Sequence, residues 1–307
     1  MGSFDMNRRA FLAALGLGSA HLLFENPLYG SSPRFSSVDP LQRVRLGNSG
    51  LKTTLLGMGT GCHASGRSSA LTRQDHQQSI ALLSYAYDRG LRQFDAADSY
   101  GTHPLLAKAM KGMERDELTL VSKIWFSSGG IPEPERPDAN VVLERFLREL
   151  ETDYIDLVQI HCMVEKGWTS AMRRQMDILE ELKAKGKIRA HGVSVHSLEA
   201  MKEAVEEPWV DVIHTRINPY GLVMDSKDPE EVVKVIHDLH AAGKGVIGMK
   251  LVGNGMLKDD SDKIDHSLRF VLGLGSVDQL IVGFEHAWQI DNYLDRMSTV
   301  LKEMHGV

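Results

Sequence analysis

The sequence predicts an α/β fold of the (β/α)8 barrel class, the TIM barrel. Short apolar runs alternate with longer stretches that carry apolar residues at helical spacing. The β-like runs cover residues 53–58, 91–95, 117–122, 155–160, 188–193, 210–214, 245–249 and 278–282. Eight strand–helix units in series, with no internal repeat between them, are typical of a closed parallel barrel inside a ring of helices.

The helical stretches between these runs are amphipathic. The clearest cover residues 74–89, 140–150, 172–185 and 229–242. Asp138, Ser197 and Asp228 stand just before helical segments, where a short polar side chain commonly caps the first turn. The helices are therefore expected on the outside of the barrel, with one apolar face inward.

A doubly wound sheet is the alternative fold. Gly57-Met58-Gly59-Thr60-Gly61 superficially resembles a dinucleotide-binding turn, but a polar stretch separates it from the next helix. A pyrophosphate-binding turn opens directly onto the amino terminus of its helix. The sequence therefore favours the barrel over the doubly wound sheet.

The composition is that of a globular protein. Of 307 residues, 42% are hydrophobic and 25% are charged, and the net charge of -6 offers no basic surface for nucleic acid. Cys62 and Cys162 fall near the ends of predicted strands, so a disulfide is geometrically possible, although two unpaired thiols are expected. Cys-x-x-Cys and His-Glu-x-x-His patterns are missing from the sequence, so no metal site is predicted.

The first forty residues differ from the rest of the chain. Residues 7–12, Asn-Arg-Arg-Ala-Phe-Leu, resemble the twin-arginine (Tat) export motif, and the apolar stretch 13–17 that follows is too short to span a membrane. We therefore expect a signal segment and linker over 1–40, a barrel over 41–307, and export by the Tat machinery to the periplasm.

Two alternatives remain open for this segment. Gly18-Ser19-Ala20 is a candidate cleavage site, but unusually apolar residues follow it, so an uncleaved signal is equally compatible with the sequence. The second alternative is that residues 1–40 are not a signal: the segment would then be a frayed amphipathic helix in which the arginine pair occurs by chance.

Four polar side chains follow three successive predicted strands. Asp95 and Tyr100 stand five residues apart after the second strand, Lys123 follows the third, and His161 follows the fourth. Because the carboxyl ends of barrel strands meet at one end of the barrel, these side chains are expected to form one site.

The chemistry of the four groups is complementary. A phenol has an ordinary pKa near ~10, an adjacent ammonium stabilises its phenolate, and a buried carboxylate keeps that ammonium charged. A neutral imidazole orients a carbonyl oxygen, so the set suits protonation of that oxygen while hydride arrives at carbon. Asp95 and Lys123 alone would suggest a structural ion pair, with Tyr100 and His161 as rim residues; the occurrence of all four favours catalysis.

These four residues resemble the catalytic tetrad of the aldo-keto reductase family, and the resemblance extends from about Val44 to Leu301. Residues 45–51 resemble the family's amino-terminal β-hairpin, and Gly192-Val193-Ser194 resembles its cofactor-contacting segment. The resemblance implies an NAD(P)-dependent oxidoreductase that acts on a small carbonyl or alcohol, with Tyr100 as proton donor or acceptor. A cofactor-binding redox sensor or regulatory subunit with little turnover is the competing interpretation.

The resemblance also implies a cofactor site. Its expected residues are Gly59, Thr60, Gly61, Ser194, His214, Met249, Lys250, Leu251, Gly255, Gly283, Glu285, Gln289 and Asn292. His214 replaces the family's usual Gln beside the nicotinamide carboxamide, and a neutral imidazole still offers one donor and one acceptor. Met249 and Lys250 are expected against the nicotinamide ring and the diphosphate; core filling and a solvated loop charge are their alternatives.

NAD(H) is favoured over NADP(H). Residues 283–293 contain no Lys or Arg to bind a ribose 2′-phosphate, and Glu285 would repel one while accepting a hydrogen bond from a free hydroxyl. A cation from another loop would reverse this preference.

Trp125 and Phe126 are the candidate substrate-binding residues. Their rings would either wall a pocket for a small carbonyl compound or pack loop 124–140 against the barrel rim. His196 is assigned a structural or substrate-rim role. The tail after the last helix is short, so the site is expected to be open unless another subunit of a small homo-oligomer covers it; a monomer is the alternative.

Overall fold

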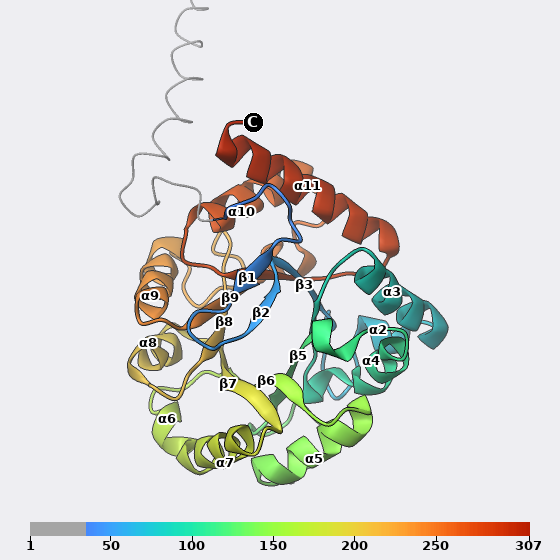
Figure 1. The fold of residues 1–307 in the computed structure, drawn as a ribbon. Helices are drawn as coiled ribbons and strands as arrows, with labels where there is room; N and C mark the ends of the chain where they lie inside the picture. Colours follow the sequence, from blue (N-terminus) through green and yellow to red (C-terminus); the bar gives the residue numbers. More distant parts are fainter. Residues whose placement is uncertain (1–34) are drawn as a thin grey trace, which may run out of the picture.

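The computed structural model describes residues 35–307, in which eight parallel strands close into a barrel in the order β10-β3-β4-β5-β6-β7-β8-β9. Helices surround the barrel, and a hairpin lies across one of its ends (Figure 1). The predicted (β/α)8 fold and the amino-terminal hairpin are both confirmed. The Tat-like motif and the candidate cleavage site lie outside the described residues.

The hairpin consists of β1 (Arg43–Arg45) and β2 (Lys52–Thr54), paired antiparallel. The barrel strands are β3 (Leu56–Gly59), β4 (Gln93–Asp95), β5 (Thr119–Ile124), β6 (Ile155–Met163), β7 (Ile188–Val195), β8 (Val212–Arg216), β9 (Gly245–Met249) and β10 (Gln279–Gly283). Each predicted run overlaps one of these strands. The first prediction began too early, because residues 52–54 pair with β1 in the hairpin before the chain enters the barrel.

The helices are α2 (Ala70–Arg73), α3 (His76–Asp88), α4 (His103–Met110), α5 (Ala139–Leu150), α6 (Trp168–Ala171), α7 (Arg173–Ala184), α8 (Leu198–Glu206), α9 (Pro229–Ala241), α10 (Ser261–Gly273) and α11 (Ala287–His305). Ser197 and Asp228 cap α8 and α9 through their side chains, as predicted. Asp138 occupies the cap position of α5, but its carboxylate binds Arg174 and Gln175 instead of the first turn. It therefore ties α5 to α7.

The hairpin closes the amino-terminal end of the barrel. Leu46 and Leu51, from the hairpin turn, join a buried cluster with barrel residues that include Val121 and Ile247. At Gly47, where φ is +49°, a Cβ atom would lie 2.4 Å from the Gly245 backbone nitrogen. This close approach seals one end, so the carboxyl ends of the strands are left for a site. Among residues 35–307, none of the helices has the length and apolar character needed to cross a membrane.

Candidate active site

The four predicted catalytic residues meet at the carboxyl end of the barrel. Asp95 ends β4, Tyr100 follows it in the short 3₁₀ helix η1 (Asp98–Tyr100), and Lys123 and His161 lie in β5 and β6. Lys123 Nζ donates to both carboxylate oxygens of Asp95, at 2.6 and 2.7 Å, and to the Ala96 carbonyl at 3.0 Å. A buried ion pair therefore forms the base of the site.

Tyr100 and His161 complete the cluster. The Lys123 ammonium lies 5.1 Å from the centroid of the Tyr100 ring. The Tyr100 and His161 rings are 5.7 Å apart and nearly perpendicular, at 81°. A Cβ atom on Gly61 would lie 2.4 Å from the Tyr100 ring, so the absence of a side chain at that position leaves room for the phenol.

The environment determines which of these groups are charged. Burial alone would raise the pKa of Asp95, but Lys123 and His214 outweigh it and lower that pKa to about 2. Burial lowers the pKa of Lys123, while Asp95 works in the opposite direction. Burial, followed by the Lys123 charge, lowers the pKa of His161 well below its ordinary value, so its imidazole is neutral near pH 7.

Tyr100 differs from the expectation that a neighbouring ammonium would favour its phenolate. Burial and the Asp95 carboxylate raise the pKa of Tyr100 well above its ordinary value. Lys123 is held by Asp95 rather than by the phenol oxygen. In this state Tyr100 is a protonated phenol, which is the form required of a proton donor.

A cleft of about 440 Å³ runs from Asp95 and Tyr100 to the start of α11. It is lined by ten of the predicted cofactor residues: Gly59, Gly61, Met249, Lys250, Leu251, Gly255, Gly283, Glu285, Gln289 and Asn292. These residues come from the ends of β3, β9 and β10, from the segments that follow these strands, and from the start of α11. The fold thus brings separate parts of the sequence onto one cleft that is continuous with the tetrad.

The other three predicted cofactor residues do not line this cleft. Thr60 is buried and bonds the Asp95 carbonyl oxygen at 2.9 Å. Ser194 accepts a hydrogen bond from the Cys162 backbone nitrogen at 2.8 Å. His214 is buried with its Nε2 atom 3.1 Å from Asp95 Oδ1. Thr60 and His214 therefore contact Asp95, and Ser194 supports β6.

Sequence reasoning missed several residues of the cleft. Cys62, Lys258, His286 and Trp288 line it as well. Lys258 is exposed and lies in the segment between β9 and α10. It is a cation that lines the cleft from outside residues 283–293.

Trp125 contacts both His161 and the loop that follows β5. Its ring is 5.1 Å from that of His161, at 89°, so it borders the tetrad. It also packs over Gly130, where a Cβ atom would lie 2.2 Å from the indole. Phe126 is half-buried and packs against the hydrophobic core.

The two cysteines are free thiols. Cys62 packs against Gly283, and Cys162 Sγ lies 3.1 Å from His196 Nδ1. Cys162 has a positive φ of 64°, at the point where the register between β6 and β7 shifts. In the part of the chain that the structure describes, no group of three or more His, Cys, Asp or Glu side chains is placed to hold a metal ion.

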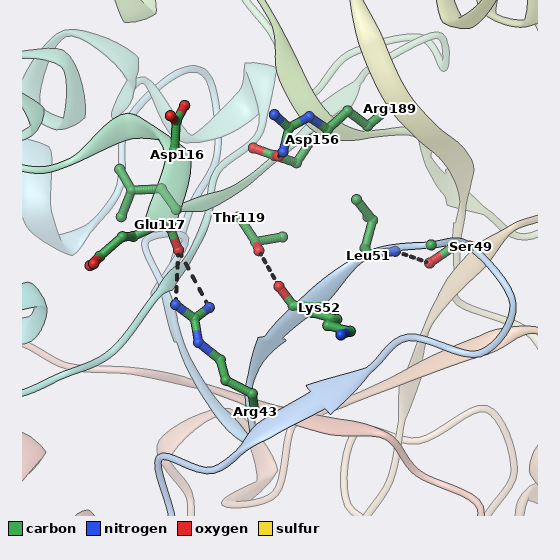
Figure 2. Close-up of a pocket in the computed structure, with 11 residues that line it drawn as sticks. Arg43, Ser49, Leu51, Lys52, Asp116, Glu117, Thr119, Asp156 and Arg189 are labelled. Atoms are coloured by element: carbon green, nitrogen blue, oxygen red, sulfur yellow. Dashed lines mark hydrogen bonds and ion pairs between the residues drawn. The ribbon is translucent and has the colours of Figure 1, made fainter.

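A second cavity, of about 350 Å³, includes residues of β1, β2 and the hairpin turn between them (Figure 2). Arg43, Lys52 and Arg189 line it together with Asp116 and Asp156. Arg189 pairs with Asp156 at 3.0 Å. None of the tetrad residues lines this cavity, so the predicted chemistry lies at the other end of the barrel.

Curated relatives share this chain's family. The chain is 26% identical over 224 residues to a probable aldo-keto reductase of Glycine max, covering 70% of this chain and 60% of the relative. It is 29% identical over 192 residues to an aldo-keto reductase of Bacillus subtilis, covering 59% and 54%. A methylglyoxal reductase of Salmonella typhi is 30% identical over 146 residues, covering 46% and 52%. The chain thus spans between half and two thirds of the length of these relatives.

Solved structures extend the comparison. A putative aldo-keto reductase from Pseudomonas aeruginosa superposes with a TM-score of 0.68 at 25% identity, covering 87% of this chain and 99% of the other. An aldo-keto reductase from Bacillus halodurans shares the fold, with a TM-score of 0.65 at 20% identity over 86% and 96% of the two chains. Members of the family are generally NAD(P)H-dependent carbonyl reductases. Residues 55–303 match the model of the aldo/keto reductase family, and the chain belongs to that family.

Proposed function

We propose that this protein reduces a small carbonyl compound with a nicotinamide cofactor, or oxidises the corresponding alcohol. The observation that supports this proposal most strongly is that the tetrad and the candidate cofactor cleft are continuous. The Asp95–Lys123 pair, Tyr100 and His161 form one cluster, and Asp95 and Tyr100 also line the cleft that holds ten candidate cofactor residues. Aldehydes, ketones and sugars are the substrate class, and the Salmonella relative's name supports small aldehydes.

Each tetrad residue has a distinct task in carbonyl reduction. Tyr100 donates its proton to the carbonyl oxygen, because burial keeps the phenol protonated. Lys123 stabilises the phenolate that remains, and Asp95 keeps the Lys123 ammonium charged. His161 Nδ1 is buried without a hydrogen-bond partner among the described residues, so we assign its other ring nitrogen to the carbonyl oxygen.

The cleft residues fit a nicotinamide dinucleotide, which when bound supplies the hydride. Gly283 leaves no room for a side chain, because a Cβ atom there would lie 2.1 Å from Cys62 Sγ. Lys250 is half-buried, and among the described residues its ammonium bonds only the Asn254 side-chain oxygen, at 2.9 Å. A half-buried ammonium without a carboxylate partner suits a diphosphate.

NAD(H) is our proposed cofactor in preference to NADP(H). Glu285 lines the cleft, and residues 283–293 contain no Lys or Arg. Lys258 is the competing feature, because it lines the same cleft. Titration with both cofactors at one ionic strength would decide between them.

The test of the proposed reaction is single-turnover oxidation of bound NADH or NADPH by a panel of small aldehydes. Rapid, saturable oxidation is expected. Tight cofactor binding without turnover would instead support the second candidate, a redox sensor or regulatory subunit. A chain that binds neither cofactor would contradict both.

We further propose that residues 1–40 direct export through the Tat machinery. The support is the Arg8-Arg9 pair followed by a short apolar stretch. Replacement of both arginines by lysine should retain the protein in the cytoplasm, as measured by cell fractionation and immunoblotting. Equal periplasmic amounts of the wild type and the variant would contradict this proposal.

A further inference from the structure

Two cations lie at the ends of neighbouring strands beside the tetrad. Arg216 is the last residue of β8, and Lys250 comes directly after β9. Arg216 is the register partner of Met249, and the Ile217 nitrogen donates to the Met249 oxygen at 2.9 Å. The two strand ends are thus held together, so two positive charges converge on the same region.

Arg216 is fixed in position with part of its guanidinium unused. Its Nε atom donates to Asp225 Oδ1 at 2.9 Å, and Nη2 contacts the same carboxylate and donates to the His196 carbonyl at 2.9 Å. Its side chain is only 14% exposed. Among the described residues, Nη1 has no hydrogen-bond partner. It is also not among the unpartnered polar atoms that are fully buried from solvent. One nitrogen of a rigid donor group is therefore available to a ligand.

Polar side chains surround Arg216 on the side of the site next to His161. Cys162 follows His161 directly, and its thiol contacts His196 Nδ1 at 3.1 Å. Burial, then the charge of Arg216, lowers the pKa of His196 to about 3, so this imidazole is neutral and retains one donor. These residues lie at the ends of β6, β7 and β8, whereas the cofactor cleft is built from the ends of β3, β9 and β10, the segments that follow these strands and the start of α11.

Asp225 is a weak counter-ion for Arg216. Its side chain is fully buried, and its Oδ2 atom has no hydrogen-bond partner among the described residues. Burial raises the pKa of Asp225 above its ordinary value. Lys250 forms no ion pair within residues 35–307, and Asp225 is the carboxylate that pairs with Arg216.

We propose that the substrate carries a carboxylate, which Arg216 binds with the help of His196, while the substrate carbonyl meets Tyr100 and His161. The free Nη1 would donate one hydrogen bond to a carboxylate oxygen, and such charge-assisted hydrogen bonds are stronger than neutral ones. The carbonyl carbon gains a hydride from the reduced nicotinamide, its oxygen gains the Tyr100 proton, and the carboxylate is unchanged. This inference rests on the proposed carbonyl reduction and specifies its substrate class.

The test compares 4-oxobutanoate with its methyl ester, which has the same reacting group without the charge. The wild-type enzyme is expected to show a kcat/KM about 10- to 100-fold higher for the acid, the range of a hydrogen bond to a charged group. The double variant Arg216→Met/Asp225→Asn removes both partners, so that no buried carboxylate is left unpaired. It should lose the preference for the acid, mainly because KM for the acid rises. Arg174→Met/Asp138→Asn makes the same change at a surface ion pair and should retain the preference.

The possible failures are distinguishable. Equal or higher kcat/KM for the ester in the wild type would overturn the carboxylate inference and leave the reductase proposal standing, whether or not the double variant folds. Equal losses for acid and ester in the double variant would also overturn it. A weaker NADH affinity in that variant would assign Arg216 to the cofactor diphosphate instead. If the wild type oxidises neither NADH nor NADPH with any aldehyde, the reductase proposal itself fails.

Discussion

Lys123 Nζ lies 2.6 and 2.7 Å from the two carboxylate oxygens of Asp95, in a pair almost completely removed from solvent. The pair joins β4 to β5 just before the short 3₁₀ helix that contains Tyr100. A buried ion pair is costly to break by removal of one partner, because the other charge is left without compensation. This relationship therefore supports both the fold and the proposed chemistry.

Asp95→Asn should reduce activity and stability together. The amide cannot keep the Lys123 ammonium charged, and removal of one partner of a buried pair typically costs about 3–5 kcal/mol. Urea unfolding measures the stability, and kcat/KM for an aldehyde measures the activity. Asp138→Asn, at a surface pair, is the control. Wild-type unfolding free energy in Asp95→Asn would show that the pair is energetically neutral.

Tyr100→Phe should abolish most carbonyl reduction and leave cofactor affinity nearly unchanged. The substitution removes the proposed proton donor but keeps the ring, and general acid catalysis contributes about 10²–10⁴-fold. Steady-state kinetics and a cofactor titration measure the two effects separately. Turnover at the wild-type rate would remove Tyr100 from its proposed role.

Gly61→Ala should lower kcat without unfolding the protein. The added methyl would lie 2.4 Å from the Tyr100 ring, so the phenol must move, and a displacement of about 1 Å at a reacting group can cost about 100-fold. Gly112→Ala is the matched control, because its Cβ would meet no atom within 4 Å. If both variants keep wild-type kcat, the ring is not constrained as described.

The fold and the tetrad were predictable from sequence because each depends on a local pattern. The carboxyl end of each strand can be recognised along the sequence: Asp95 ends β4, and Lys123 and His161 lie near the ends of β5 and β6. Barrel closure then brings these ends together without further information. The first strand was placed too early, because the β-branched Thr53 and Thr54 of the hairpin run directly into the apolar Leu55 and Leu56.

The cofactor and substrate residues were harder to predict, because their positions depend on contacts between distant segments. His214 was assigned to the carboxamide from its place in the sequence, and only the structure shows that its Nε2 atom lies 3.1 Å from Asp95 Oδ1. Lys258 and Arg216 give no local signal: one is an exposed loop lysine, and the other is oriented by Asp225 from a different loop. The protonation of Tyr100 depends on burial, which only the packed structure reveals.

Acid should destabilise the protein through carboxyl groups that are ionised in the fold. Burial works against ionisation of Glu149, but hydrogen bonds from His103 and Arg145 lower its pKa to about 2, and that of Asp95 is also about 2. Because both pKa values are depressed, the stabilisation is complete above the unfolded-state values near ~4 and is lost as pH falls towards 2. Urea midpoints from pH 6 to pH 2 should fall less steeply for Glu149→Gln than for the wild type.

That experiment requires a variant that removes one ionised carboxyl group without altering the tetrad. Glu149 lies on α5, outside the cleft, so Glu149→Gln tests the acid dependence without changing Asp95. Parallel pH dependences in the wild type and the variant would show that Glu149 is not ionised by its neighbours as described.

Cofactor preference should depend on the balance between Glu285 and Lys258, which line the same cleft. NADH is expected to bind more tightly than NADPH, because Glu285 would repel a 2′-phosphate and accept a hydrogen bond from a free 2′-hydroxyl. Glu285→Arg should narrow or reverse the preference, and Lys258→Met should strengthen it by weakening NADPH alone. Titrations of both cofactors at one ionic strength measure these effects, because salt screens exposed phosphate contacts. Tighter NADPH binding by the wild type, lost in Lys258→Met, would assign the discrimination to Lys258 and leave the tetrad unaffected.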